Sequence, residues 1–466
     1  MASVLAACSS VVRHAPAPLP MALVSARSGP LERCVGAAYS VRTNALTEEE
    51  TARHMSALTF VPKRSAAAPA SAKPPETVVA AAHVGPSLRV PRAYGYAAFG
   101  APETCVLSDG ALAPSLATCT LELRPYQREP AAGVLAALME GPRTAILNGE
   151  VGSGKTATAA YIMHRLARRT LILAHTTGIG AMWADRMPAY FPEAALGKLS
   201  LKRGEPDIVL GTIQTYARHP DLFWSRGPFG LVVFDEVHHV PARTFLPAAM
   251  SAPCAILGLS ATTHRKDGMS GLLWATMGNE YPMAAPKVHA SVELVKFSYT
   301  NPLSYTKRAQ PPTWLKYGQL CGHEGRNAWQ LQRLLELLAE GRSILATTDR
   351  VEHAKVLVDR AREVAGAERV GLLVGGVKGA ALRAEQAKPL KIGTVACNGE
   401  GVDLSIDTLA VLNNASNPVQ QLGRLRAGAG SQPQLVVLFE DGLDRNWMSR
   451  ETHRRGWPLR IVSVSL

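Results

Sequence analysis

The sequence predicts an α/β protein with two tandem domains, each built on a parallel sheet, and a small N-terminal region before them. With 466 residues, 47% of them apolar, the chain is longer than a single hydrophobic core usually organises. After Leu123, short apolar runs alternate with helical stretches, which is typical of parallel strands buried between helices. A glycine-rich loop joins one of these runs to a helix. These observations exclude a lone small binding module.

The composition narrows the class of partner. The chain has 50 Lys and Arg against 37 Asp and Glu, a formal charge of +13, which favours a polyanion such as nucleic acid. The 7 cysteines form no C-x-x-C pair, so neither a zinc site nor a disulfide framework is indicated. No apolar run reaches the length of about eighteen residues that suggests a membrane span, so we expect no membrane partner.

The first 118 residues divide into two predicted regions. Residues 1–41 are rich in Ala, Ser, Val and Arg, a composition of disordered extensions and also of organelle-targeting segments. Residues 42–118 are expected to form an accessory region, in which Thr47 caps a helix that begins with three glutamates. Residues 66–77 have the composition of a flexible Pro/Ala linker.

The predicted strands fall into two groups. A first domain is expected over 119–290 and a second over 291–445, followed by a basic aromatic tail over 446–466. The apolar runs that define the two domains lie at residues 144–147, 170–174, 207–212, 231–236 and 255–261, and then at 343–348, 369–376, 391–396, 408–414 and 434–440.

The glycine-rich loop is a phosphate-binding motif. It reads G-x-x-x-x-G-K-T and stands between the first apolar run and a helical stretch. Glycines let backbone N–H groups surround phosphate oxygens, Lys155 reaches the β and γ phosphates, and Thr156 holds Mg²⁺. We therefore expect ATP and Mg²⁺ as cofactors, with the phosphates held by Gly149, Gly152, Ser153, Gly154, Lys155 and Thr156.

Two carboxylates follow the fourth apolar run, at the edge of a parallel sheet where ligands bind. Asp235 is expected to hold Mg²⁺, and Glu236 to orient or deprotonate the attacking water. His238 and His239 follow. A metal site is the alternative interpretation for these histidines, but neighbouring side chains on a strand end point in opposite directions and no third ligand is evident.

The order of motifs resembles that of superfamily 2 DEAD/DEAH-like helicases. The loop, D-E-x-H and Ser260-Ala261-Thr262 are similar to motifs I, II and III, and the run to Gly268 is similar to the S-A-T-P-x-R-K-D-G of the XPB/UvsW-like branch. Leu123-Arg124-Pro125-Tyr126-Gln127 resembles the element whose glutamine recognises adenine, although a plain surface glutamine is the alternative. The resemblance implies two RecA-like domains and a coupling role for His238, Ser260 and Thr262.

The resemblance extends into the second domain. Residues 399–404 resemble motif V, with Gly401 and Asp403 implied at the nucleotide, and Gln420-Gln421-Leu422-Gly423-Arg424 resembles the opening of motif VI. In the family the motif VI arginines act as arginine fingers, a role that passes here to Arg424 and Arg426, with Gln420 beside the nucleotide. The spacing after Arg424 is one residue shorter than the family pattern, which rotates Arg426 by about 100° on a helix. Further similarities point to helicases encoded by large DNA viruses of eukaryotes; they lie at residues 45–47, 58–63, 90–95, 326–327, 348–353 and 374–378.

The family's strand-binding motifs imply a nucleic-acid surface. The matching residues are Thr176, Thr212, Gln214, Thr348 and Arg350, whose hydroxyl, amide and guanidinium groups suit phosphate without reading sequence. Taken singly, each threonine also fits a helix cap or a turn. The tail places Trp447 and Trp457 among arginines, which suits base stacking or, alternatively, a closing helix packed on the second domain.

The sequence therefore predicts an ATP-dependent helicase or translocase acting on nucleic acid, with DNA favoured over RNA and with protein partners in replication, repair or transcription. A nucleotide-gated nucleic-acid-binding protein with weak ATPase activity is the alternative, because motif VI is shortened. A restriction-type nuclease motor needs a P-D-x-x-D/E-x-K centre, which the chain lacks. A viral origin implies the nucleus, a viral factory or the virion as location, whereas the N-terminal composition leaves an organelle open.

Overall fold

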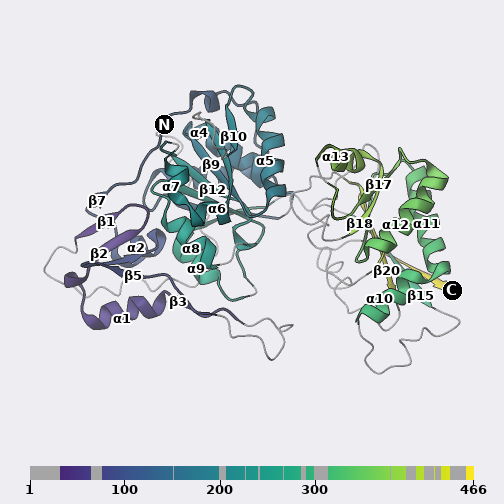
Figure 1. Cartoon of the computed structure of the whole chain (residues 1–466), viewed down its shortest axis with the longest axis horizontal. Coiled ribbons are helices and arrows are strands. Elements are labelled where there is room, and N and C mark those ends of the chain that lie inside the picture. Colours follow the sequence, from purple (N-terminus) through teal and green to yellow (C-terminus); the bar gives the residue numbers. More distant parts are fainter. Residues whose placement is uncertain are drawn as a thin grey trace. The chain divides into compact units, whose positions relative to one another are not determined.

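The computed structural model separates into two compact units, Met1–Ala285 and Pro286–Leu466. Both units are drawn in Figure 1. The structure describes residues 32–63, 76–150, 152–198, 206–225, 227–239, 242–265, 267–284, 290–298, 313–377, 379–394, 406–413, 425, 432–440 and 458–465.

The first unit opens with an accessory region built on short strands. Its five-stranded sheet has the order β5-β6-β2-β1-β7, and a strand pair, β3-β4, lies outside it. The helix α1 begins as predicted, because Thr47 and Glu50 form a capping box. Its strands β1 and β2 include residues that the sequence assigned to the N-terminal extension. The elements are β1 (Arg33–Val35), β2 (Tyr39–Arg42), α1 (Glu48–Ala57), β3 (Thr59–Phe60), β4 (Val78–Val79), β5 (Ala82–Val84), β6 (Ser87–Val90), α2 (Arg92–Phe99) and β7 (Thr104–Cys105).

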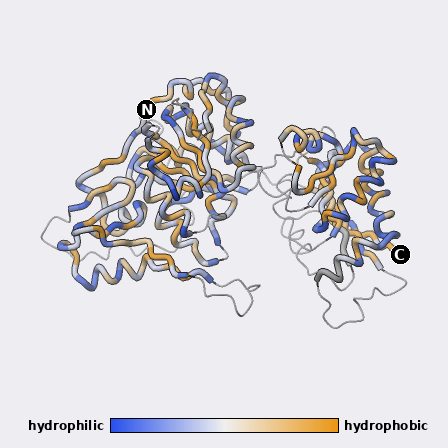
Figure 2. The backbone as a smooth tube through the Cα atoms, viewed as in Figure 1, coloured by the Kyte–Doolittle hydropathy of each residue, from blue (hydrophilic) through white to orange (hydrophobic). Residues whose placement is uncertain are grey.

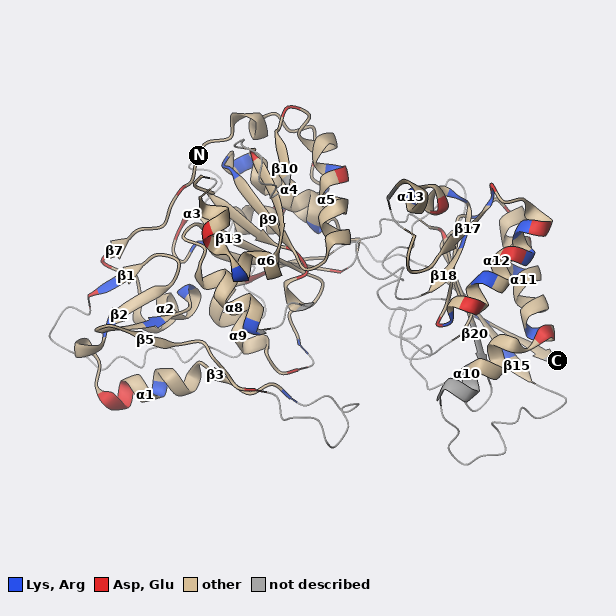
Figure 3. Cartoon of the chain, in the orientation of Figure 1, with Lys and Arg blue, Asp and Glu red and all other residues tan. Residues whose placement is uncertain are grey.

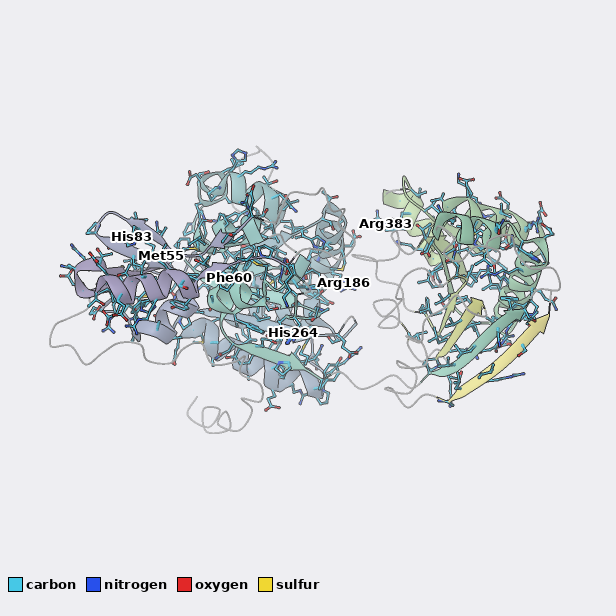
Figure 4. All side chains as sticks on the ribbon, turned by 90° about the horizontal axis from the view of Figure 1, so that it is seen from below. Met55, Phe60, His83, Arg186, His264 and Arg383 are labelled. Carbon is cyan, nitrogen blue, oxygen red and sulfur yellow. The ribbon has the colours of Figure 1, made fainter. Side chains whose placement is uncertain are left out.

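The accessory region shares a core with the domain that follows. Its buried residues pack against Leu246, Leu272 and Ala275 of that domain, and Met55 and Phe60 line the same cluster (Figure 4). The backbone N–H of Lys63 donates to the carbonyl of Asp267 at 2.8 Å, and a Cβ on Gly271 would lie 2.8 Å from the Phe60 ring. The region is therefore part of the first unit's hydrophobic interior.

A seven-stranded parallel sheet forms the centre of the first unit, in the order β10-β11-β9-β12-β13-β8-β14. Helices α3, α4 and α5 pack on one face of it, and α6 to α9 on the other, so its central strands are apolar on both faces. Figure 2 shows this apolar concentration in the strands. The strands are β8 (Thr144–Gly149), β9 (Thr170–Ala174), β10 (Leu196–Lys198), β11 (Ile208–Thr212), β12 (Leu231–Phe234), β13 (Ala255–Ser260) and β14 (Glu280–Met283). The helices are α3 (Pro125–Met139), α4 (Lys155–Leu166), α5 (Thr177–Tyr190), α6 (Ile213–Arg218), α7 (Pro220–Trp224), α8 (Ala242–Met250) and α9 (Ser270–Met277).

The second unit repeats this architecture with a seven-stranded parallel sheet in the order β17-β18-β16-β19-β20-β15-β21. Helices α11 and α12 pack on one face, and charges of both signs mark their outer sides (Figure 3). The strands are β15 (Ser291–Ser298), β16 (Ile344–Thr348), β17 (Val370–Leu373), β18 (Leu390–Thr394), β19 (Thr408–Val411), β20 (Gln434–Glu440) and β21 (Leu459–Ser465). The helices are α10 (Thr313–Gly322), α11 (Glu324–Ala339), α12 (Val351–Ala365) and α13 (Gly379–Ala387).

These two sheets confirm the predicted fold class of two tandem α/β domains with parallel sheets. Within the tail, residues 459–465 form β21, an edge strand paired with β15. Both tryptophans of the tail, Trp447 and Trp457, lie outside the described residues, as does most of the 66–77 stretch. Among the described residues, no helix combines the length and the apolar character needed to cross a bilayer.

Candidate nucleotide-binding site

The glycine-rich loop lies between β8 and α4, as the sequence predicts. Gly152 and Gly154 have φ of 81° and 87°, left-handed values that side chains other than glycine adopt only with strain. Space is also short, because a Cβ on Gly154 would lie 2.3 Å from Nε2 of Gln127 and one on Gly149 would lie 2.5 Å from the Ser153 hydroxyl. The loop therefore requires glycine for its conformation and for its close packing.

Polar groups with spare bonding capacity line this loop. Lys155 is buried, and its Nζ donates to the carbonyl of Gly149 at 2.8 Å and lies 3.9 Å from Oε1 of Glu236. The Ser153 hydroxyl is buried and has no partner among the residues that the structure describes. A cation, an unpartnered hydroxyl and the N-terminus of α4 at one place suit a phosphate group.

Gln127 braces the loop in this structure. Its Oε1 accepts from the N–H of Arg124 at 2.9 Å, which closes the first turn of α3, and its Nε2 donates to the carbonyl of Ser153 at 3.1 Å. The hydroxyl of Tyr126 donates to the same carbonyl at 3.0 Å. Adenine recognition by Gln127 stays a prediction, and the plain surface glutamine is excluded because the side chain is buried.

Asp235 follows β12 and is held by two donors. Its Oδ2 accepts from the indole N–H of Trp183 at 2.7 Å, and its Oδ1 accepts from the N–H of Glu236 at 2.9 Å. Burial raises the pKa of Asp235, and the Trp183 hydrogen bond and the charge of Lys155 oppose that shift. The carboxylate is 4% exposed and has a fixed orientation.

Glu236 adopts a backbone conformation that glutamate rarely takes, with φ of 49°. Its side chain is 21% exposed, and its Oε2 lies 3.4 Å from Nδ1 of His238. Backbone strain of this kind is concentrated at functional sites, where surrounding structure holds it in place. The turn directs the Glu236 carboxylate between Lys155 and His238, a position from which it can act on a water molecule.

The three predicted coupling residues form one hydrogen-bonded chain. The Ser260 hydroxyl donates to the carbonyl of Thr262 at 2.5 Å, so its oxygen accepts from Nδ1–H of His238 at 2.8 Å. This contact joins the end of β13 to the turn after β12, and it gives His238 a role other than metal binding. Coupling itself stays a prediction.

Arg265 fixes the same turn from the other side. Its guanidinium donates to the carbonyl of His238 at 2.7 Å and to both carboxylate oxygens of Asp267. Asp267 also accepts from the N–H of Met269, and Gly268 has φ of 78°. The R-x-D-G part of the sequence signature thus connects His238 with the backbone that contacts the accessory region.

The residues present fit a magnesium–triphosphate. Asp235 and Thr156 supply a carboxylate and a hydroxyl, and Mg²⁺ prefers such oxygen ligands. The unpartnered hydroxyl of Ser153 and the ammonium of Lys155 suit the phosphates. When bound, the ion would neutralise charge on the phosphates, while Lys155 and Glu236 supply charge and base from the protein.

The strand-contact residues predicted in the first unit lie together at one sheet edge. Thr176 caps α5 by accepting from the N–H of Ile179, and Thr212 caps α6 by accepting from the N–H of Thr215. Gln214 donates to the carbonyl of His175 at 3.1 Å, so it connects the two caps. The capping interpretation is therefore confirmed for both threonines, and their contact with a strand stays a prediction.

The two predicted contact residues of the second unit differ in exposure. Arg350 is exposed at the first turn of α12. Thr348 is 0% exposed, and its hydroxyl donates to His353 at 2.9 Å while accepting from Asn413 at 2.9 Å. Neighbouring side chains enclose the Thr348 hydroxyl in this structure, and its contact with a strand stays a prediction.

Thr348 belongs to a buried polar network that the sequence did not predict. Nε2–H of His353 donates to Asn327 at 3.1 Å, and Asn413 accepts from the N–H of Asp349 at 3.0 Å. Burial lowers the pKa of His353 to about 3, so the ring is neutral at ordinary pH, in agreement with one N–H and one acceptor nitrogen. The network fixes the turn that carries Arg350.

Five of the predicted site residues, all in motifs V and VI, lie outside the described residues: Gly401, Asp403, Gln420, Arg424 and Arg426. Their roles stay predictions. The contact of Asp235 that sequence reasoning missed comes from Trp183, which lies 52 positions before it and within an apolar helix face. An aromatic residue on such a face gives no local signal for a polar contact.

The chain is similar in sequence and in fold to known helicases and to a restriction-enzyme subunit family. Residues 120–265 match the family model described as "Type III restriction enzyme, res subunit". The chain is 26% identical over 392 residues to "Putative ATP-dependent RNA helicase L396" of Acanthamoeba polyphaga mimivirus, covering 80% of this chain and 74% of that protein. It is 28% identical over 222 residues to "Probable helicase D10" of Escherichia phage T5, covering 46% and 48%. The structure titled DUF1998 helicase MrfA bound to DNA and AMPPNP is similar in fold, with a TM-score of 0.51 and 12% identity over 73% of this chain and 52% of that one.

Proposed function

We propose that the chain is a superfamily 2 helicase, similar to the viral helicases that it matches, and that it couples ATP hydrolysis to movement on, or unwinding of, nucleic acid. The observation that carries the proposal is the cluster at the glycine-rich loop. There the Lys155 ammonium lies 3.9 Å from the Glu236 carboxylate, and Glu236 lies 3.4 Å from His238. A phosphate-binding cation beside a partly exposed carboxylate suits attack of water on a phosphoryl group.

Each residue has a defined part in this proposal. Lys155 stabilises the charge that develops on the transferred phosphoryl group. Glu236 orients or deprotonates the water, and His238 with Ser260 relates the state of that carboxylate to the end of β13. Arg424 and Arg426 would complete the charge neutralisation in the manner of arginine fingers.

We propose DNA as the first substrate to test. The net charge of +13 favours a nucleic-acid partner, and the helicase MrfA, which shares this fold, was solved with DNA. The mimivirus relative carries the name of an RNA helicase, so RNA belongs in the same experiment.

The test is phosphate release stimulated by strands. Purified chain is mixed with Mg-ATP and with 3′-tailed, 5′-tailed, forked and branched duplexes of DNA and of RNA. We expect turnover that rises with the strand and is abolished in E236Q, since the amide cannot accept a proton from water. Nucleotide-dependent strand binding without turnover in the wild type would instead favour the nucleotide-gated binding protein.

A further inference from the structure

The carboxylate of Asp235 accepts a hydrogen bond from α5, a helix that belongs neither to the glycine-rich loop nor to the turn after β12. The donor is the indole N–H of Trp183, at 2.7 Å from Oδ2, and the indole is 0% exposed. A buried indole N–H needs an acceptor, and here that acceptor is a carboxylate at the nucleotide site. Since the Glu236 N–H binds the other oxygen, the two donors together fix rotation of the carboxylate about its Cβ–Cγ bond.

Trp183 connects this carboxylate with the N-terminal end of α5. Ile179, Trp183 and Met187 form the buried face of α5, each about one turn from the next. Thr176, the predicted strand contact, caps the same helix and lies two turns, about 10 Å, before Trp183. A shift of the first turn of α5 therefore moves the indole that holds Asp235.

We propose that Trp183 is a positioning residue that orients the Asp235 carboxylate and couples strand contact at the first turn of α5 to binding of the magnesium–nucleotide. This inference rests on the proposed function. Residues that donate hydrogen bonds to a ligand of a metal orient that ligand, and their loss commonly weakens metal affinity about 10- to 100-fold. Coupling of this kind is reciprocal, so the strand and the magnesium–nucleotide should each strengthen binding of the other.

The experiment compares wild-type protein with W183F, in which the ring is kept and the donor is lost. Binding of a fluorescent non-hydrolysable ATP analogue is titrated with Mg²⁺, with and without single-stranded DNA. We expect the Mg²⁺ concentration for half-saturation to rise about tenfold in W183F, and analogue binding in EDTA to stay unchanged. We also expect the strand to lose most of its effect on analogue affinity.

Trp224 offers a matched control in the same unit. Its indole N–H donates to the Tyr216 hydroxyl at 2.9 Å, on the opposite face of the sheet. W224F removes an equivalent hydrogen bond and should leave the Mg²⁺ titration and the strand effect as in the wild type. Equal shifts in W183F and W224F would mean that any lost indole contact loosens the unit, and would overturn the proposal.

A Mg²⁺ titration of folded W183F that matches the wild type also overturns the inference, while the proposed function stands if the wild type hydrolyses ATP. If the wild type binds no nucleotide at all, both fail. Should W183F not fold, 3-benzothienylalanine at position 183 keeps the shape of the side chain and removes only the N–H. The same tenfold shift is then expected, and its absence refutes the role of Trp183.

Discussion

The carboxyl edges of the two sheets use similar residues in opposite ways. In the first unit, Glu236 is partly exposed and the Ser153 hydroxyl has no partner among the described residues. In the second unit, Thr348, His353 and Asn413 bond to one another and are enclosed. Both edges are the place where a parallel sheet offers a ligand site. The comparison teaches that polar residues after a strand indicate a site only where their bonding capacity is left open.

Replacement of Lys155, at the carboxyl edge of the first unit's sheet, has the largest expected effect. Replacing it with alanine should lower ATP hydrolysis about 10²- to 10³-fold, because a cation at the transferred phosphate is lost. The fold should persist, since Lys155 donates only to the carbonyl of Gly149 in the described structure. Phosphate release and thermal denaturation measure the two expectations.

K355A is the matched control for that change, because Lys355 is a surface residue paired with Glu352 on α12. It should hydrolyse ATP at the wild-type rate. Hydrolysis that survives in K155A would refute the assignment of the loop.

Replacement of Asn413 tests the buried polar network of the second unit. The change N413A removes the amide that donates to the Thr348 hydroxyl and accepts from the Asp349 N–H, at an expected cost of about 2–4 kcal/mol in the stability of the second unit. Nucleotide affinity should be unchanged. Urea denaturation measures the stability, and binding of the ATP analogue measures the nucleotide affinity. Weakened nucleotide binding in folded N413A would contradict the inference that this network serves stability and not nucleotide binding.

The pH dependence of stability follows from His353. Its pKa is about 3 in the folded chain and near 6.5 when unfolded, so the unfolded state binds the extra proton between these values. The stability that depends on neutral His353 is therefore complete above pH 6.5 and declines as pH falls. From pH 7 to pH 5 the decline is about 2 kcal/mol. Urea denaturation across this range should show a smaller pH slope in H353Q, and an equal slope would assign the acid sensitivity to other groups.

Arg350 carries the smallest expected effect, on strand binding. The buried network orients the turn from which this exposed side chain extends, so R350A should weaken DNA binding a few-fold and lower the salt slope by about one unit. Wild-type affinity should fall steeply between about 50 and 200 mM salt. Fluorescence anisotropy measures both, with R360A, which breaks a surface ion pair on the same helix, as the control. A salt slope unchanged in R350A would remove this residue from the interface.

The sequence predicted the fold better than it predicted the contacts. The buried central strands are continuous apolar runs and were found in place. The edge strands β10, β14 and β21, and β15 beside β21, were missed because they are short or mix polar with apolar residues. Motif spacing placed Lys155 at the start of α4 and Asp235 at the end of β12, because such spacing is a local property. The Trp183–Asp235 bond and the enclosure of Thr348 join residues far apart in sequence, and only packing brings them together.

The accessory region has a practical consequence for anyone who wishes to shorten this protein. Residues before Gly100 cover Leu246, Leu272 and Ala275. A truncated protein that starts near residue 119 would therefore expose an apolar patch to water. It would also lose the hydrogen bond from the N–H of Lys63 to the carbonyl of Asp267. The Asp267 carboxylate binds Arg265, and Arg265 in turn donates to the carbonyl of His238. A truncation chosen from the sequence motifs alone would therefore give an aggregation-prone fragment in which the turn after β12 is less well held.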